Sequence, residues 1–465
     1  MNSDFLDYYR CPADFATFAL TGRLCEDAGY FRFGPDVLCY GQSLSGVRAK
    51  CPTDLLYDAM NDVVPDGSTL RLPFSPTDIV ANLRYERYAS SANGTGKRLG
   101  GGSAARRAYY AVRPILPVSI RKHLQRISLR DWKRIPFPRW PADTTVERIF
   151  ERLMVLLLKV QPADSVPFIW FWPNGFSSCV ILTHDVESLG GRNVCRQLMD
   201  LEDSYEVKSS FQIVPEGRYP VPESFLESFR RRGFEINVHD LNHDGHLFSD
   251  RELFFRRAER INRYGRNYGA DGFRSAVLYR NQDWYEALDF AYDMSVPSVG
   301  HLDPQRGGCC SVMPFFIGKT LELPVTTTQD YSLFHILNQY STELWKQQIN
   351  LITEKHGLVS FIVHPDYLLE SRARETYEAL LAYLAELRSE RKIWIALPRE
   401  VNVWWRQRSQ MRLVHRGNRW EIEGPGKERA GIAYASLEGD SVVYRLEAPS
   451  PAPSLVETPS PVAAD

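Results

Sequence analysis

Long hydrophobic runs are scarce in this chain. The densest apolar stretch, residues 153–158 within 149–160, is much shorter than the roughly 18 residues that a membrane-spanning helix needs. The first ten residues also lack the basic segment followed by an apolar one that marks a secretory signal. We therefore expect no transmembrane segment and a location in the cytoplasm.

Cysteines are few and scattered. The chain has eight, and no two of them form a Cys-x-x-Cys pair. This density is too low for a disulfide scaffold. We expect free and mostly buried thiols.

The chain also has no excess of charge of either sign: 56 Lys and Arg residues nearly balance 57 Asp and Glu residues. The net charge therefore indicates no nucleic-acid partner, acidic substrate or membrane surface. Residues 97–139 are a local exception, with twelve basic residues and one acid, Asp131. We favour a solvated surface helix over 121–134, with contact to an anionic glycan or a membrane surface as the alternative.

The composition is that of a globular protein, with 44% hydrophobic and 12% aromatic residues over 465 positions. A chain of this length divides into about three structural units. We expect an N-terminal α+β accessory region over 1–165, a central unit over 166–405 and a small antiparallel β unit over 406–447. The glycine-rich residues 93–102 predict a mobile loop, and the Pro- and Ala-rich residues 448–465 a disordered tail.

From about residue 177, short runs rich in Val, Ile and Phe alternate with longer amphipathic segments, which is typical of βα units. The count favours an α/β fold with a closed or nearly closed barrel. The expected strands are 179–183, 209–214, 234–238, 271–273, 292–296, 320–325, 358–363 and 393–397. The expected helices are 194–205, 222–232, 251–266, 342–356 and 372–388.

Four of these strands run directly into polar residues suited to hydrolysis: the Thr183-His184-Asp185 segment, His239, Arg274 and His364. In a βα barrel the carboxyl ends of the strands share one rim. Packing does not explain a carboxylate, two imidazoles and a guanidinium at four separate strand ends. The sequence therefore predicts a hydrolytic site at this rim.

His239 and His243 are four residues apart, so one helical turn after the strand would point both rings the same way. Two neutral imidazoles and a carboxylate can bind a divalent metal. Asp185 and Glu187 are the nearest carboxylates, and one could be a ligand while the other accepts a proton. Two surface histidines are the alternative, and His246 is near enough to be a competing ligand.

The order Thr-His-Asp-Val-Glu, His-x-x-x-His, Gly-Phe-Arg and Val-His-Pro resembles the NodB-type polysaccharide deacetylases of carbohydrate esterase family 4. The resemblance covers residues of about 170 to 405. It implies a NodB-type distorted (β/α) barrel that removes N- or O-acetyl groups from sugars with a divalent metal, often zinc.

The resemblance also implies a role for each matching residue. His239 and His243 match the two histidine ligands of the metal, and Asp185 matches the catalytic base. His364 matches the histidine that protonates the leaving group, and Arg274 matches the arginine that orients the base.

This chain departs from the family pattern at the second position of the first motif. The family has two adjacent aspartates there, the second of which is a metal ligand, whereas this chain has Val186. We predict that Glu187 is the substitute ligand, with Asp185 as the alternative. The segment after Gly272 reads Phe-Arg-Ser-Ala-Val rather than the Arg-Pro-Pro-Tyr type, which predicts altered substrate contacts.

The predicted function is a zinc- or other metal-dependent deacetylase that acts on an acetylated sugar or glycan. In the cytoplasm, a sugar nucleotide, a lipid-linked precursor or an oligosaccharide would be the coherent substrate. Two alternatives stay open: another metal-dependent amidohydrolase on a similar barrel, and a catalytically silent carbohydrate-binding protein whose β unit after Trp405 could bind the sugar.

Overall fold

The computed structural model describes residues 3–46, 49–91, 127 and 129–447. The expected loop at 93–102 and the expected tail at 448–465 lie outside the described residues, as does most of the basic segment 97–139. Of the helix expected over 121–134, the described residues 127 and 129 are helical, and the segment ends in a 3-10 turn, η4 (Trp132–Arg134).

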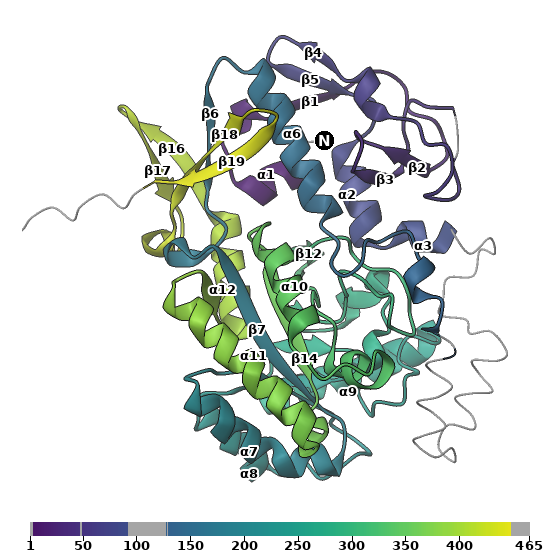
Figure 1. Ribbon diagram of the computed structural model, residues 1–465, viewed down its shortest axis with the longest axis vertical. Helices are drawn as coiled ribbons and strands as arrows, with labels where there is room; N and C mark the ends of the chain where they lie inside the picture. The colour runs from purple at the N-terminus through teal and green to yellow at the C-terminus, as the bar shows by residue number, and fades with distance from the viewer. Residues whose placement is uncertain (1–2, 47–48, 92–126, 128, 448–465) are drawn as a thin grey trace, which may run out of the picture.

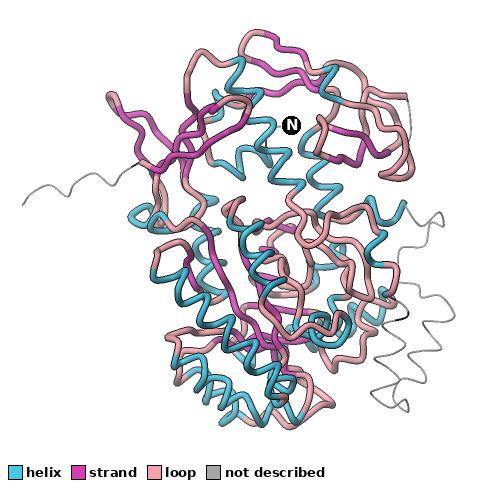
Figure 2. Tube along the Cα trace, in the orientation of Figure 1, coloured by secondary structure: helices cyan, strands magenta, loops and turns pink. Residues whose placement is uncertain are grey.

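A curled, mostly parallel sheet forms the lower half of the molecule in Figures 1 and 2. All eight expected strands occur in it, and one further antiparallel strand, β12 (Phe315–Ile317), pairs with β13. The sheet order is β12-β13-β11-β10-β9-β8-β7-β14, and β15 also pairs with β7. Its parallel strands are β7 (Ser178–Val186), β8 (Ser210–Ile213), β9 (Glu235–His239), β10 (Gly272–Arg274), β11 (Tyr292–Asp293), β13 (Thr320–Glu322), β14 (Leu358–Val363) and β15 (Ile393–Ile395).

Helices follow most of the strands, as expected of βα units. Ser188 and Asp250 accept backbone N–H groups at the starts of two of these helices, which satisfies donors that have no partner within the helix. Each of the five predicted helices is present. They are α7 (Leu189–Ser204), α8 (Glu223–Arg230), α9 (Arg251–Tyr268), α10 (Glu343–Thr353) and α11 (Ser371–Ser389), and α12 (Pro398–Gln410) comes after β15.

The barrel closes between the segment after β13 and strand β14, without a regular ladder of backbone hydrogen bonds. After β13 the chain runs alongside β14, where the Thr327 N–H donates to the Ser360 carbonyl at 3.3 Å. The Thr326 hydroxyl bridges the same strands, because it donates to the Leu358 carbonyl at 2.7 Å and accepts the Ser360 N–H at 2.9 Å. Side chains thus replace part of the backbone pairing, and the predicted distorted (β/α) barrel is confirmed.

The upper half of the molecule is an α+β region built around the long helix α6 (Thr145–Val160) (Figure 1). It contains short strands in three small groups and three further helices. These elements are α1 (Ser3–Tyr9), β1 (Thr17–Leu20), β2 (Gly29–Arg32), β3 (Leu38–Gly41), β4 (Val64–Asp66), β5 (Thr69–Leu72), α2 (Pro76–Arg84), α3 (Arg87–Ser91) and β6 (Ser165–Ile169).

The C-terminal strands form two antiparallel pairs, β16 (Arg412–Arg416) with β17 (Arg419–Glu423) and β18 (Ile432–Glu438) with β19 (Ser441–Leu446). Because β18 also pairs with β6, this β unit packs on the N-terminal region. We call residues 3–169 and 411–447 together the lobe.

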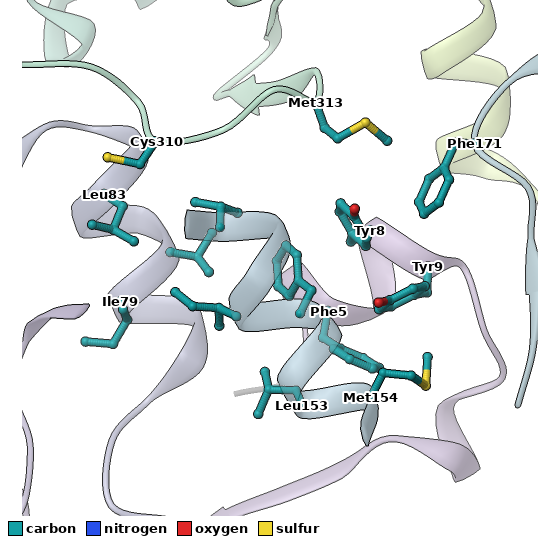
Figure 3. Packing of buried hydrophobic residues seen from close by; sticks show 14 of the residues in the cluster. Phe5, Tyr8, Tyr9, Ile79, Leu83, Leu153, Met154, Phe171, Cys310 and Met313 are labelled. Carbon is teal, nitrogen blue, oxygen red and sulfur yellow. The ribbon is translucent and has the colours of Figure 1, made fainter. Parts of the chain in front are cut away.

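The core of the lobe is continuous with the underside of the barrel. Figure 3 shows Phe5, Tyr8 and Tyr9 of α1 beside Leu153 and Met154 of α6. Met313 and Phe171 lie above them, at the junction with the barrel. The lobe and the barrel are therefore held together by shared apolar burial.

All eight cysteines are free and six of them are buried, which confirms that prediction. Among the described residues, no helix combines the length and the apolar character that crossing a membrane requires.

Candidate metal centre

Asp185 and Arg274 form a buried ion pair at the carboxyl ends of β7 and β10. Arg274 is fully buried, and its Nη1 donates to Asp185 Oδ1 and to the Thr183 hydroxyl, both at 2.7 Å. Its Nε donates to the Met294 carbonyl at 3.0 Å. Side chains two apart on a strand share a face, so Thr183 and Asp185 both meet the guanidinium, which fixes the orientation of the carboxylate.

This pairing keeps Asp185 ionised. Burial alone would raise the pKa of the Asp185 carboxyl, but the Arg274 guanidinium and then His239 outweigh burial and hold that pKa below its usual value. Asp185 is thus a carboxylate whose Oδ1 is occupied by Arg274. Its Oδ2 lies 3.6 Å from His239 Nε2.

His239 is the last residue of β9, and its ring is oriented by the neighbouring strand. Its Nδ1 lies 3.1 Å from the Arg274 carbonyl oxygen. A carbonyl can only accept, so Nδ1 carries a proton and Nε2 is the ring nitrogen that faces the carboxylates. A backbone carbonyl on the far ring nitrogen is a common support for a metal-binding histidine.

The helical turn predicted between His239 and His243 is wrong. The chain there is an irregular loop in which Asp240 and His243 have φ of 53° and 54°. Neighbouring segments take up the backbone groups of this loop: the Asp240 N–H donates to the Arg274 carbonyl, and Arg218 donates to the carbonyls of Asn242 and His243. The two imidazole centroids still lie 4.8 Å apart.

Glu187 lies just past β7, at the meeting point of three imidazoles. Its Oε1 is 2.7 Å from His243 Nε2, 3.3 Å from His364 Nε2 and 3.6 Å from His239 Nε2. Burial would raise the pKa of the Glu187 carboxyl, but His243 and then His364 lower it well below the usual value. Glu187 is therefore an anion surrounded by imidazoles.

These side chains fit a divalent cation. Glu187, His239 and His243 offer ligand atoms that all lie within 4.8 Å of one another, and Asp185, Glu187 and His364 form a second, overlapping group. Within the described part of the chain, the buried Nε2 atoms of His239 and His243 have no aligned hydrogen-bond partner. Buried nitrogens are usually satisfied, and two imidazoles with a carboxylate are a typical zinc donor set. His246 is exposed and belongs to neither group.

His364 follows β14 and is held by Asp330, which sequence reasoning missed. Asp330 Oδ1 lies 2.6 Å from His364 Nδ1, and Oδ2 accepts the His364 backbone N–H at 2.6 Å. Burial lowers the pKa of His364, but Asp330 and then Glu187 raise it well above its usual value. These carboxylates favour the protonated imidazole, and its Nε2 points toward Glu187.

His184, which the sequence placed in the same motif, has a different position. It projects from the opposite face of β7, where its Nε2 lies 2.8 Å from Glu202 Oε1 and its Nδ1 lies 3.1 Å from the Val363 carbonyl. Tyr377 donates to the same Glu202 oxygen at 2.6 Å. Both ring nitrogens bond to neighbouring elements, one to Glu202 of α7 and the other to Val363 of β14. His184 therefore supports β7 on the face opposite the site.

The structure thus brings Asp185, Glu187, His239, His243, Arg274 and His364 together at one end of the barrel and adds Asp330. Asp330 lies 34 residues before its partner, so no local spacing reveals the pair. The available signal was the polar run Thr-Thr-Thr-Gln-Asp after a predicted strand, which puts a carboxylate at the same rim.

No protein-family model and no curated protein matches this chain. Similar solved structures include two proteins named as polysaccharide deacetylases, from Mycobacterium smegmatis (18% identity, 53% of this chain and 94% of that chain, TM-score 0.43) and Pseudomonas aeruginosa PAO1 (14%, 50% and 92%, 0.40). A family 4 acetyl xylan esterase from Clostridium thermocellum, solved with a cobalt ion, is also similar (16%, 49% and 91%, 0.32). At this level of likeness, function has to be inferred from the site itself.

Proposed function

We propose that this protein is a metal-dependent deacetylase of the polysaccharide deacetylase type, which hydrolyses an N- or O-linked acetyl group of a carbohydrate or glycan precursor. The observation that carries the proposal is the arrangement around Glu187. Two imidazoles face Glu187 with Nε2 atoms that make no aligned hydrogen bond, and Asp185, held ionised by Arg274, and His364, held by Asp330, flank it.

Glu187, His239 and His243 would hold the cation, and their donor set favours zinc. A divalent cation in such a site supplies Lewis acidity toward a water molecule and toward an acyl oxygen. Asp185 Oδ2 is as far from His239 Nε2 as Glu187 Oε1 is, at 3.6 Å. This distance keeps Asp185 open as the alternative ligand.

Asp185 has the properties of the general base. Arg274 occupies its Oδ1, so Oδ2 is the oxygen that remains to accept a proton from the attacking water. The ion pair also holds the carboxylate in a single orientation, which removes the cost of ordering it during the reaction. In this role Arg274 positions the base and does not touch the substrate.

His364 has the properties of the general acid. Asp330 holds its Nδ1 and favours the protonated ring, while its Nε2 faces Glu187. It would give its proton to the departing sugar amine or alkoxide. Such proton transfer contributes a rate factor of about 10²–10⁴, and the Asp330 carboxylate stabilises the charged ring before that step.

We also propose that the protein acts in the cytoplasm on a sugar nucleotide, a lipid-linked precursor or an oligosaccharide. Eight free cysteines, including the adjacent Cys309 and Cys310, are typical of a reducing compartment. Fractionation of cells that express the protein tests the location, and recovery outside the cytoplasm would contradict it.

Metal content is the direct test of this function. Elemental analysis is made on the wild type, on the double variant His239→Ala/His243→Ala and on His246→Ala, each shown to be folded by circular dichroism. His246 is a matched control because it is a nearby but exposed histidine outside the cluster. We expect about one metal ion per chain in the wild type and in the control, and none in the double variant.

Acetate release from acetylated mono- and oligosaccharides is then measured on the same three proteins. We expect activity that follows the metal content. Absence of metal from the wild type after reconstitution with zinc, cobalt or iron would overturn the proposal, and a metal-loaded protein without acetate release would favour the silent sugar-binding alternative.

A further inference from the structure

A loop between β8 and α8, residues 214–219, connects the two segments that carry Glu187 and His243. We call it the bridging loop. It bonds to the end of β7 on one side and to residues 241–243 on the other. None of its residues belongs to the groups that could hold a cation, so any effect of this loop on the metal centre is indirect.

Tyr219 of the bridging loop fixes the backbone next to Glu187. Its hydroxyl donates to the Val186 carbonyl at 2.6 Å and accepts the Val214 N–H at 3.1 Å. Val186 is the last residue of β7, and Val214 directly follows the last residue of β8. The hydroxyl therefore joins the ends of two neighbouring strands at the point where Glu187 leaves the sheet.

The orientation of Glu187 depends on this anchor, because the residue lies beyond the strand ladder. Side chains alternate along β7, so Asp185 faces the metal centre, Val186 is fully buried in the apolar core and residue 187 faces the centre again. The ladder with β8 ends at Val186. Beyond it, Tyr219 holds the carbonyl that precedes Glu187, and Ser188 caps α7 on the other side.

The bridging loop also holds the segment that carries His243. Three consecutive carbonyls of this segment accept hydrogen bonds from it: Leu241 from the Glu216 N–H at 3.0 Å, Asn242 from Arg218 Nε at 3.1 Å, and His243 from Arg218 Nη2. The segment is neither helix nor strand, so its backbone groups have no regular partners of their own. These bonds therefore define its conformation.

Glu187 and His243 contact each other, so both anchors act on one distance. Glu187 Oε1 lies 2.7 Å from His243 Nε2. Side chains that bind one cation have to keep their ligand distances within about 0.2 Å of the usual values. A backbone shift at Val186 or at residues 241–243 would change the metal centre without removing a ligand. Loss of a partner that orients a metal ligand typically lowers metal affinity about 10–100-fold.

We propose that Tyr219 and Arg218 are positioning residues of the metal centre, which set the spacing of Glu187 and His243 and so determine the affinity and the coordination geometry of the cation. The inference rests on the proposed function, because it uses the metal ligands named there. It goes further in assigning a specific effect on the metal to two residues that supply no ligand atom.

The test compares Tyr219→Phe and Arg218→Leu with matched controls elsewhere in the chain. Tyr88→Phe also removes a buried hydroxyl that donates to a backbone carbonyl at 2.6 Å. Arg388→Leu also removes a guanidinium that donates to two consecutive carbonyls, those of the residues after α7. Neither control residue belongs to the groups that could hold a cation.

Each protein is stripped of metal, its melting temperature is measured, and zinc is titrated in competition with a chelator. Cobalt is then bound in place of zinc, because its visible absorption reports the coordination geometry. We expect Tyr219→Phe and Arg218→Leu each to weaken zinc binding about tenfold and to change the cobalt spectrum. The two controls should lower the melting temperature but keep the zinc affinity and the cobalt spectrum of the wild type.

Two results would overturn the positioning role. One is a lower melting temperature of Tyr219→Phe and Arg218→Leu with unchanged zinc affinity and cobalt spectrum, which would make both residues merely structural. The other is an equal loss of affinity in the controls, which would show that affinity follows overall stability.

Acetate release by the same proteins separates this inference from the proposed function. If the wild type binds zinc but releases no acetate, the deacetylase proposal fails, and tenfold weaker zinc binding by both variants still supports the positioning role. If the wild type is active and both variants bind zinc as tightly as it does, only the positioning role is rejected. If the wild type binds no metal after reconstitution, both proposals are rejected.

Discussion

The barrel rim and the junction between the barrel and the lobe both bury charged side chains, but they satisfy them in opposite ways. At the junction, Arg408 of α12 is 1% exposed and donates to the carbonyls of Tyr8, Ile169 and Trp170 at 2.7–3.0 Å. At the rim, the Nε2 atoms of His239 and His243 are buried without an aligned partner.

This difference separates architecture from function. The buried guanidinium of Arg408 links three backbone segments through their carbonyls. Burial lowers the pKa of Arg408 to about 9, but no reactive side chain is among these partners. Buried ring nitrogens that converge on a carboxylate without an aligned hydrogen bond are unusual in a purely structural site. The comparison predicts that changes at the rim affect catalysis, whereas changes at the junction affect stability.

The largest effect is expected from His364→Ala. Loss of the general acid should lower the rate of acetate release by about a factor of 10²–10⁴ in the folded protein. Steady-state kinetics on metal-loaded protein measures the rate, and His415→Ala, an exposed histidine of β16, is the matched control. A variant that keeps its rate but loses stability would show that the rim is structural.

Arg408→Leu should have the reverse effect. It removes the donors to several buried carbonyls, so we expect a loss of about 3 kcal/mol in the free energy of unfolding and an unchanged kcat for the folded fraction. Urea denaturation and acetate release measure the two quantities. Arg412→Leu is the control, because its guanidinium is 73% exposed and pairs at the surface. Loss of kcat without loss of stability would break the comparison.

Glu147 of α6 allows a test with a smaller expected effect, because one of its carboxyl oxygens is also buried without a partner. Its Oε1 accepts the Ser311 hydroxyl at 2.6 Å and the Val312 N–H at 3.2 Å, whereas Oε2 has no partner among the described residues. Burial raises the pKa of this carboxyl to about 7, which the Ser311 hydroxyl partly offsets. In the lobe, an unpaired oxygen thus belongs to an acid that holds its proton up to about pH 7.

The sign of the pH effect follows from that shift. The folded state binds the Glu147 proton more tightly than the unfolded state does. The stabilisation that comes from this proton is therefore complete below about pH 4.5 and is lost as the pH rises through about 7. Glu147→Gln should therefore be more stable than the wild type at pH 8, on the order of 2 kcal/mol, and differ less at pH 5. Identical pH profiles in urea unfolding would contradict the assignment.

The repeating elements of the barrel could be predicted from local pattern. The expected strand at 358–363 matches β14, and the expected helix at 251–266 falls within α9. Apolar periodicity is set by neighbouring residues and therefore survives in a single sequence. The motif residues Asp185 and His364 were identifiable for the same reason, since each lies within two residues of the end of a predicted strand.

Other features needed the tertiary structure. The turn between His239 and His243 is not helical, because Arg274 and Arg218 supply backbone partners that no local spacing shows. The pairing of β18 with β6 joins segments more than 260 residues apart.

The sequence by itself determined which side chains stand at the strand ends, because a strand end and the polar residue after it are neighbours in the chain. Only the tertiary structure decided that Glu187 lies among three imidazoles and that Asp330 holds His364. Those contacts depend on the curvature of the sheet and on its closure at residues 325–328, which bring together loops that are distant in the chain.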